Sequence, residues 1–148
     1  MSVSGQIERG VHVLVSLSVT NSLSNFGCRH NRIQALPEFF LQLQKLAELD
    51  VSFNNMPILL DDIGFLSRLE RLYLAGNRLS VLPVSIGQLS ALQVLDASAN
   101  VLTILPNELG QCTSLVKLDL SKNRLAELPV SLAQLNALIV FYSSIVHA

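Results

Sequence analysis

The chain has 148 residues, which is enough for one domain. Half of its residues are hydrophobic and only 14% are charged, against about 25% in ordinary soluble domains, so we expect a large core beneath a thinly charged surface. The net charge of −1 argues against a broad electrostatic footprint for nucleic acid or for acidic membranes.

The first 22 residues contain one apolar segment, Val11 to Val19. This segment is too short to span a bilayer. A signal peptide would need a basic region before it, and Glu8 next to Arg9 supplies no net positive charge. Because apolar residues alternate within the segment, the sequence predicts a strand there. We interpret residues 1–22 as a degenerate capping segment.

One asparagine and one leucine recur every 23 residues after this segment. The asparagines are Asn31, Asn54, Asn77, Asn100 and Asn123, and the leucines are Leu23, Leu46, Leu69, Leu92, Leu115 and Leu138. A fixed period of this length without insertions is typical of a solenoid. The sequence therefore predicts five 23-residue repeats over residues 23–137.

The spacing of apolar residues changes within each repeat. Leu72 and Leu74 alternate with polar neighbours, which predicts a short strand. Leu82, Ile86 and Leu89 follow at helical spacing. Proline precedes this part at Pro37, Pro83, Pro106 and Pro129, where it suits the first position of a helix. Stacked repeats should place parallel strands on one side and helical returns on the other.

The recurring asparagines have a predicted structural role. The chain turns sharply after each strand and buries backbone groups that need hydrogen-bond partners. An asparagine amide both donates and accepts. We therefore expect Asn31, Asn54, Asn77, Asn100 and Asn123 to form a ladder that bonds the backbone of neighbouring coils.

The pattern LxxLxLxxNxLxxLPxxIGxLxx, with Leu82-Pro83 and Ile86-Gly87 as one example, resembles the leucine-rich repeat family. It is most similar to the intracellular 23-residue subclass of Ras-interacting leucine-rich-repeat scaffolds, the Scribble and Erbin group and the plant intracellular Ras-group proteins. The resemblance implies an α/β leucine-rich-repeat solenoid. It would be a right-handed βα superhelix, with a curved parallel sheet on the concave side and short helices or 3-10 turns on the convex side.

Three places depart from the pattern. The second repeat has Leu60 where proline is usual, so its convex return should differ locally. The first repeat has Leu41 where three others have glycine. Residues 138–148 are an incomplete sixth repeat or an atypical tail. Their stretch LIVFYSSIV is apolar and charge-free, which favours aggregation at an open edge. Three interpretations are open: a last strand, a contact with another chain, or a fragment of a longer protein.

Cys28 and Cys112 are the two cysteines, and both fall in apolar columns of the repeat. Free cysteine behaves as a small hydrophobe, so we expect two buried structural thiols. Clustered cysteines at the chain ends, which would indicate disulfides, are lacking in the sequence. This pattern favours a reducing, cytoplasmic compartment.

The sequence contains no recognisable catalytic constellation. His12, His30 and His147 are scattered without metal-ligand spacing. There is neither a nucleophile elbow nor a phosphate-binding glycine loop. Asp61-Asp62 begins a predicted helical return, where it more readily complements the helix N-terminus than binds a metal. We expect a non-catalytic protein without cofactor or metal.

The outward residues of the strands are the remaining candidates. The central column holds Asp50, Tyr73, Asp96 and Asp119, and nearby positions hold Arg71, Lys117 and Phe53. Neighbouring strands lie about 4.8 Å apart, so these carboxylates should be close together and would favour a basic partner. The alternative is that aspartate is simply usual at this column, with Lys117 and Lys122 offsetting its charge.

The predicted function is therefore that of a protein-interaction module whose concave sheet binds a partner protein. The family resemblance implies Ras-type small GTPases or signalling and scaffold complexes as partners. Three other interpretations stay open. They are the recognition arm of a larger enzyme, such as a kinase or ubiquitin ligase, a fragment of an extracellular recognition receptor, and a truncated gene product with an unnatural tail from Phe141 on.

Overall fold

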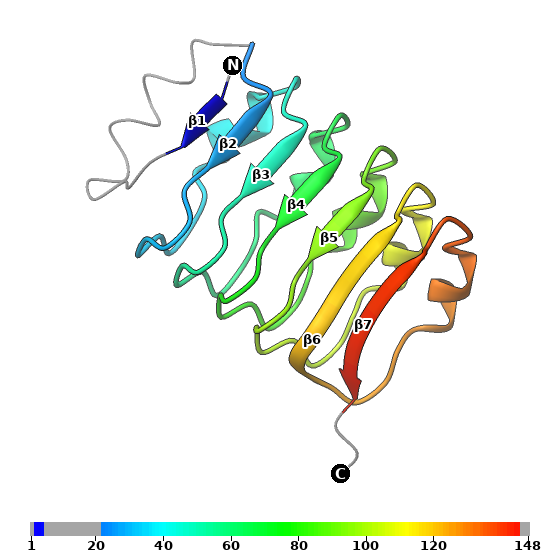
Figure 1. The fold of residues 1–148 in the computed structure, drawn as a ribbon. Coiled ribbons are helices and arrows are strands. Elements are labelled where there is room, and N and C mark those ends of the chain that lie inside the picture. Colours follow the sequence, from blue (N-terminus) through cyan, green and yellow to red (C-terminus); the bar gives the residue numbers. More distant parts are fainter. Residues whose placement is uncertain (1, 5–21, 146–148) are drawn as a thin grey trace.

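The computed structural model describes residues 2–4 and 22–145. Seven strands follow one another in a single parallel sheet, each paired with the next along the chain (Figure 1). They are β1 (Ser2–Ser4), β2 (Asn25–Gly27), β3 (Glu48–Asp50), β4 (Arg71–Tyr73), β5 (Val94–Asp96), β6 (Lys117–Leu125) and β7 (Val140–Ile145). Each strand start pairs with the residue 23 positions later, as in Glu48 with Arg71, so one repeat makes one coil of the solenoid.

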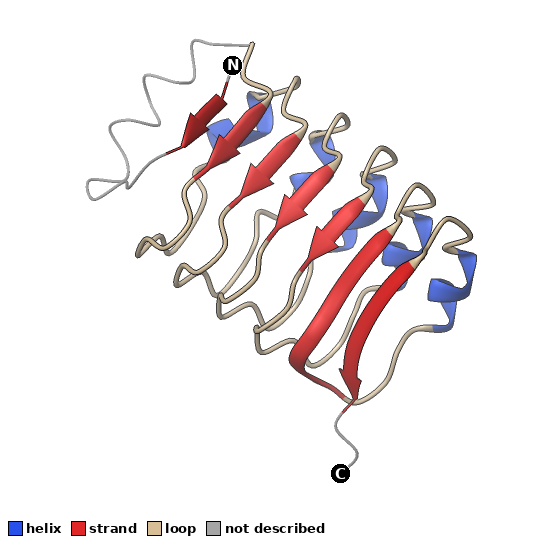
Figure 2. Ribbon diagram, in the orientation of Figure 1, coloured by secondary structure: helices blue, strands red, loops and turns tan. Residues whose placement is uncertain are grey.

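Five short 3-10 helices lie on the opposite side of the solenoid from the strands (Figure 2). They are η1 (Glu38–Gln42), η2 (Ile63–Phe65), η3 (Val84–Gln88), η4 (Asn107–Gln111) and η5 (Val130–Gln134). The predicted solenoid, with a parallel sheet on one side and 3-10 turns on the other, is confirmed. We keep the names concave face for the free face of the sheet and convex side for the side of the helices.

The prolines stand one position earlier than predicted. Pro37, Pro83, Pro106 and Pro129 precede the first helical residue of their 3-10 helices and have extended backbone angles. Their carbonyls accept the first helical hydrogen bond, as Pro83 does from the amide of Ile86 at 3.1 Å. Proline thus suits the entry to the turn, because its fixed φ fits extended backbone as well as a helix.

The core runs between the sheet and the helices as columns of equivalent side chains. The second residue of each internal strand is buried, as at Leu49, Leu72, Leu95 and Leu118. Burying such a side chain stabilises the fold by about 1.5–3 kcal/mol. Since each column continues from coil to coil, every coil covers the apolar edge of the coil before it.

Buried asparagines connect successive coils. The Nδ2 of Asn100 donates to the carbonyl of Ala97 in its own coil and to that of Leu74 in the preceding coil, at 3.1 and 3.0 Å. Its Oδ1 accepts from the amide of Leu79, also in the preceding coil, at 3.0 Å. The same bonds recur at Asn54, Asn77 and Asn123. Asn31 donates to the carbonyls of Cys28 and Arg29 in its own coil.

The residue before each asparagine has a left-handed backbone conformation. The φ angles lie between 51° and 66° at His30, Phe53, Gly76, Ala99 and Lys122. Such angles are uncommon for residues other than glycine. The recurrence of the conformation at every coil shows that the turn and its asparagine bonds outweigh the local strain.

A second column, on the convex side, requires glycine because of close packing. A Cβ atom added at Gly87 would lie 2.5 Å from the carbonyl oxygen of Glu108 in the next coil. A Cβ atom added at Gly64 would likewise clash with the carbonyl oxygen of Ser85, and one added at Gly110 with that of Ser131. Glycine therefore lets consecutive 3-10 helices approach each other directly.

The two ends of the sheet differ from its middle. At the first end, β1 pairs with β2 in the register Ser2 to Asn25, and the strand predicted within Val11 to Val19 lies outside the described residues. At the other end, residues 138–148 contribute β7, and its Phe141 pairs with Leu118 of the core column but stays 40% exposed. In the described part of the chain, the longest helices are too short to cross a membrane.

Candidate functional site

The concave face brings together the residues of the predicted central column. The strand register places Asp50 beside Tyr73, Tyr73 beside Asp96, and Asp96 beside Asp119. All four side chains are partly exposed. Since neighbouring strands lie about 4.8 Å apart, the result is a continuous row of one phenol and three carboxylates across four strands.

The aspartates of this row also close the turns that follow their strands. In Asp96, Oδ1 accepts hydrogen bonds from the backbone amide and the hydroxyl of Ser98, at 3.0 and 2.7 Å. Asp119 has the same two bonds from Ser121, at 2.9 and 2.7 Å. Asp50 accepts from the amide of Ser52 at 3.0 Å. The aspartates therefore have a structural role in addition to any role in binding.

The position of these serines corrects one expectation. The residues six places after the first leucine of each repeat were expected to point outward. Arg29 is exposed and Ser98 and Ser121 are partly exposed, as expected, but Ser52 and Ala75 are only 2% and 7% exposed. The usable concave face is therefore narrower than expected at the second and third repeats.

Three polar side chains form a network ahead of the central column. Glu48 Oε2 accepts from Nε of Arg71 at 2.8 Å and from Nδ2 of Asn25 at 3.3 Å, which links β2, β3 and β4. Arg71 also lies 3.6 Å from the carboxylate of Glu70. The Glu48 hydrogen bond is the main cause that raises the pKa of Arg71. Arg71 is thus held in place beside Tyr73, whose own pKa is raised first by burial and then by the charge of Glu48.

The lysines do not neutralise the aspartate row by direct pairing. In the part of the chain that the structure describes, neither Lys117 nor Lys122 forms an ion pair with Asp96 or Asp119. Asp50 is the member of the row with such a partner, Nε of Arg29 at 3.3 Å. The negative charge of the row is therefore concentrated toward β5 and β6.

Phe53, His30 and Arg29 form an aromatic cluster at the edge of the concave face, which was not predicted from the sequence. Phe53 is 43% exposed and stacks on the ring of His30, with centroids 4.6 Å apart and planes within 2° of parallel. The guanidinium carbon of Arg29 lies 5.8 Å from the centre of the Phe53 ring. On the other side of Phe53, a Cβ atom at Gly76 would lie 2.5 Å from the ring. The 23-residue spacing of residues 30, 53 and 76 was the signal for this contact.

Within the described residues, the two cysteines do not form a reactive site and the acidic residues do not form a metal site. Cys28 and Cys112 are free and buried, and burial raises their pKa values to about 12 and about 11, with Asp50 contributing at Cys28. The described side chains contain no group of three or more His, Cys, Asp or Glu residues suited to hold a metal ion. Asp62 stands at the N-cap of η2 without a side-chain capping bond, so the predicted helix-end role lacks a direct hydrogen bond.

Comparisons with known proteins agree with this architecture. The protein-family model described as Leucine rich repeat matches residues 21–79 and, a second time, residues 67–125, which together exceed half of the chain. The search among curated proteins gave no match. Among solved structures, the LRR protein LIC12759 of Leptospira interrogans is similar, with a TM-score of 0.58 and 24% sequence identity. The match covers 97% of this chain and 49% of that one, so the chain spans about half of its length, and at this identity the likeness concerns the fold alone.

The buried thiols lead to a prediction about alkaline stability. Between the ordinary thiol pKa of about 8.5 and the folded value of about 12 at Cys28, the unfolded chain loses protons that the folded chain keeps. This contribution to stability is complete below pH 8.5 and falls as pH rises toward 12. Urea unfolding from pH 8 to pH 10.5 should show a steeper loss for the natural chain than for the Cys28→Ala, Cys112→Ala variant. Equal pH slopes in the two proteins would contradict the prediction.

Proposed function

Because the chain belongs to the leucine-rich repeat family, we propose that it is a protein-interaction module whose concave face binds a partner protein. The observation that supports this most directly is the row of Asp50, Tyr73, Asp96 and Asp119 in register across β3 to β6. Like charges placed side by side oppose folding. A positively charged partner would relieve that repulsion.

The surroundings of the row suit a protein interface. Tyr73 lies between two carboxylates, and Arg71 is already ordered by Glu48, so both can contact a partner at a low cost in conformational entropy. Tyrosine and arginine are the side chains most often found as energetic anchors of interfaces. Phe53 extends this surface at the edge beside His30. Lys117, the first residue of β6, places a positive charge two residues before Asp119 on the same strand.

The partner that we propose is a Ras-type small GTPase or a related signalling complex in the cytoplasm. The support for this is the similarity of the repeat to the intracellular 23-residue subclass, at residues such as Leu82-Pro83 and Ile86-Gly87. Two buried, unpaired thiols are compatible with a reducing compartment. A role as the recognition arm of a larger enzyme would use the same concave face, so it predicts the same binding residues.

The proposal is tested by a variant that removes the charges of Asp96 and Asp119 and the ring of Tyr73 but keeps the turns after the strands. Asparagine in place of Asp96 and Asp119 retains an oxygen that accepts the serine bonds, and Tyr73→Ala removes the phenol. The matched control is Glu108→Gln, Glu127→Gln, which removes two charges from other parts of the fourth and fifth repeats. Both variants would be compared with the natural chain in pull-downs from cytosol and against a panel of purified Ras-type GTPases. We expect partners that the concave variant loses and the control retains. Identical partners in all three samples would mean that binding does not use the concave face.

Self-association is a second candidate function, favoured by the last coil. Leu128, Leu132 and Leu138 remain only partly buried there, while Val130 and Ile139 are 90% and 81% exposed. Among the described residues no strand pairs with the outer edge of β7, and an unpaired strand edge is a template for pairing with another chain.

If the chain self-associates through this edge, a charged side chain introduced there should dissociate the copies of the chain. We expect sedimentation velocity to show a dimer or larger species for the natural chain, and a monomer for Ile139→Lys. The control is Val84→Lys, an exposed valine of η3 that lies away from the edge. A natural chain that sediments as a monomer would exclude self-association.

A further inference from the structure

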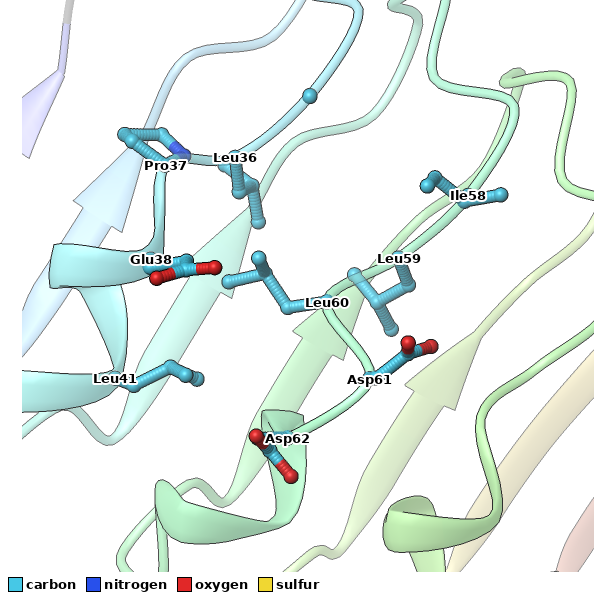
Figure 3. A pocket seen from close by; sticks show the side chains of 10 residues that line it. Leu36, Pro37, Glu38, Leu41, Ile58, Leu59, Leu60, Asp61 and Asp62 are labelled. Atoms are coloured by element: carbon cyan, nitrogen blue, oxygen red, sulfur yellow. The ribbon is translucent and has the colours of Figure 1, made fainter.

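A groove of about 490 Å³ opens on the convex side between the first and second repeats (Figure 3). The first repeat contributes Ala35, Leu36, Pro37, Glu38 and Leu41, and the second contributes Ile58, Leu59, Leu60, Asp61 and Asp62. Its volume falls within the range of common ligand sites. The groove lies on the side of the solenoid opposite the concave row, so it is independent of the binding surface proposed above.

The groove results from a leucine side chain where the next three coils have glycine. Gly64 lets η2 approach the carbonyl of Ser85 in the next coil, and Leu41 holds the same place in the first coil, 23 residues earlier. The residue that Leu41 would meet by this register is Asp62, and both line the groove. The side chain of leucine fills the space that glycine leaves empty, so the second coil cannot approach η1 as closely.

One hydrogen bond between the second and third coils has no counterpart at the groove. Between the second and third coils, the hydroxyl of Ser85 donates to the carbonyl oxygen of Asp61 at 2.5 Å and draws the coils together. The position of Ser85 is occupied by Asp62 one coil earlier. A carboxylate accepts hydrogen bonds but does not donate them, so it cannot make the corresponding bond to a carbonyl of the first coil. The same position is Glu108 in the fourth coil and Ser131 in the fifth, whose hydroxyl has no hydrogen-bond partner among the described residues, so this bond is particular to Ser85. The second coil also has Leu60 where the others have proline, and η2 is three residues long, whereas the other four 3-10 helices have five.

The lining combines apolar walls with negative charge. Leu36, Leu41 and Leu60 form apolar walls, and Ile58 at one end is 60% exposed. Figure 3 shows the side chains of Glu38 and Leu60 pointing toward one another, with Asp61 and Asp62 at the adjoining edge. None of the lining residues is basic, and within the described residues these three carboxylates form no ion pair. The three acids do not form a metal site by their arrangement.

We propose that this groove is a second binding site, which takes a short peptide segment of a partner protein with an apolar side chain flanked by lysine or arginine. The apolar side chain would enter between Leu36, Leu41 and Leu60. The flanking cations would lie against Glu38, Asp61 and Asp62, which lack a positive partner in the described structure. This complementarity selects a basic-apolar segment over an acidic one, because like charges at an interface oppose association.

The test uses an array of capped six-residue peptides in which leucine, isoleucine or phenylalanine is flanked by lysine or arginine. A second array carries aspartate or glutamate in place of the basic residues. We expect the natural chain to bind members of the first array and not of the second. Asp61→Asn, Asp62→Asn should weaken binding about tenfold, the sum of two exposed charge contacts. The control Glu108→Gln, Glu127→Gln should bind as the natural chain does.

A second variant tests the shape of the groove without changing its charge. Leu41→Gly introduces the residue that the second, third and fourth coils have at this position, and we expect it to narrow the groove and to weaken binding of the same peptides. Circular dichroism melts would verify that each variant is folded. Equal binding of the two arrays, or peptide binding that is unchanged in both groove variants, would overturn the proposal. So would a dimer that Asp61→Asn, Asp62→Asn disperses, since the occupant would then be a second copy.

Discussion

Each coil from the second to the fifth is tied to the preceding one by an asparagine amide buried between them. The internal strands β2 to β5 have only three residues each, so their ladders alone provide few hydrogen bonds per coil. Asn54, Asn77, Asn100 and Asn123 add donors and an acceptor at the point where the chain leaves the sheet. Without them, several buried carbonyl and amide groups would lack partners, at a cost of about 1–3 kcal/mol each.

This constraint fixes the register of the fold and thereby the place of each outward side chain. The carboxylates of Asp96 and Asp119 are aligned because both strands end at the same level, and their serine bonds preserve that level. The same regularity makes the groove on the convex side stand out. One leucine in a column where the next three coils have glycine is enough to separate the coils at Leu41 and Asp62.

The sequence allowed the coil, the strands and the asparagine ladder to be predicted because five copies of each position could be compared. A column that is apolar at Leu49, Leu72, Leu95 and Leu118 has one physical explanation, which is burial. Features that depend on contacts between two particular coils were harder. The stack of His30 on Phe53 and the burial of Ser52 depend on backbone angles that the apolar pattern does not report. The departures from the repeat at Leu41 and Leu60 were visible in the sequence, but the groove between the two coils was not predicted from them.

The central claim is that the asparagine ladder holds the coils in register, and one stability measurement tests it directly. Urea denaturation of Asn100→Ala would be compared with that of Asn136→Ala, the same change at an exposed position. Asn100 makes bonds to Leu74, Ala97 and Leu79, so its loss should lower the free energy of unfolding by about 2–5 kcal/mol. The Asn136 variant should stay within about 0.5 kcal/mol of the natural chain. If both variants unfolded at the same urea concentration as the natural chain, the ladder would not be what fixes the register.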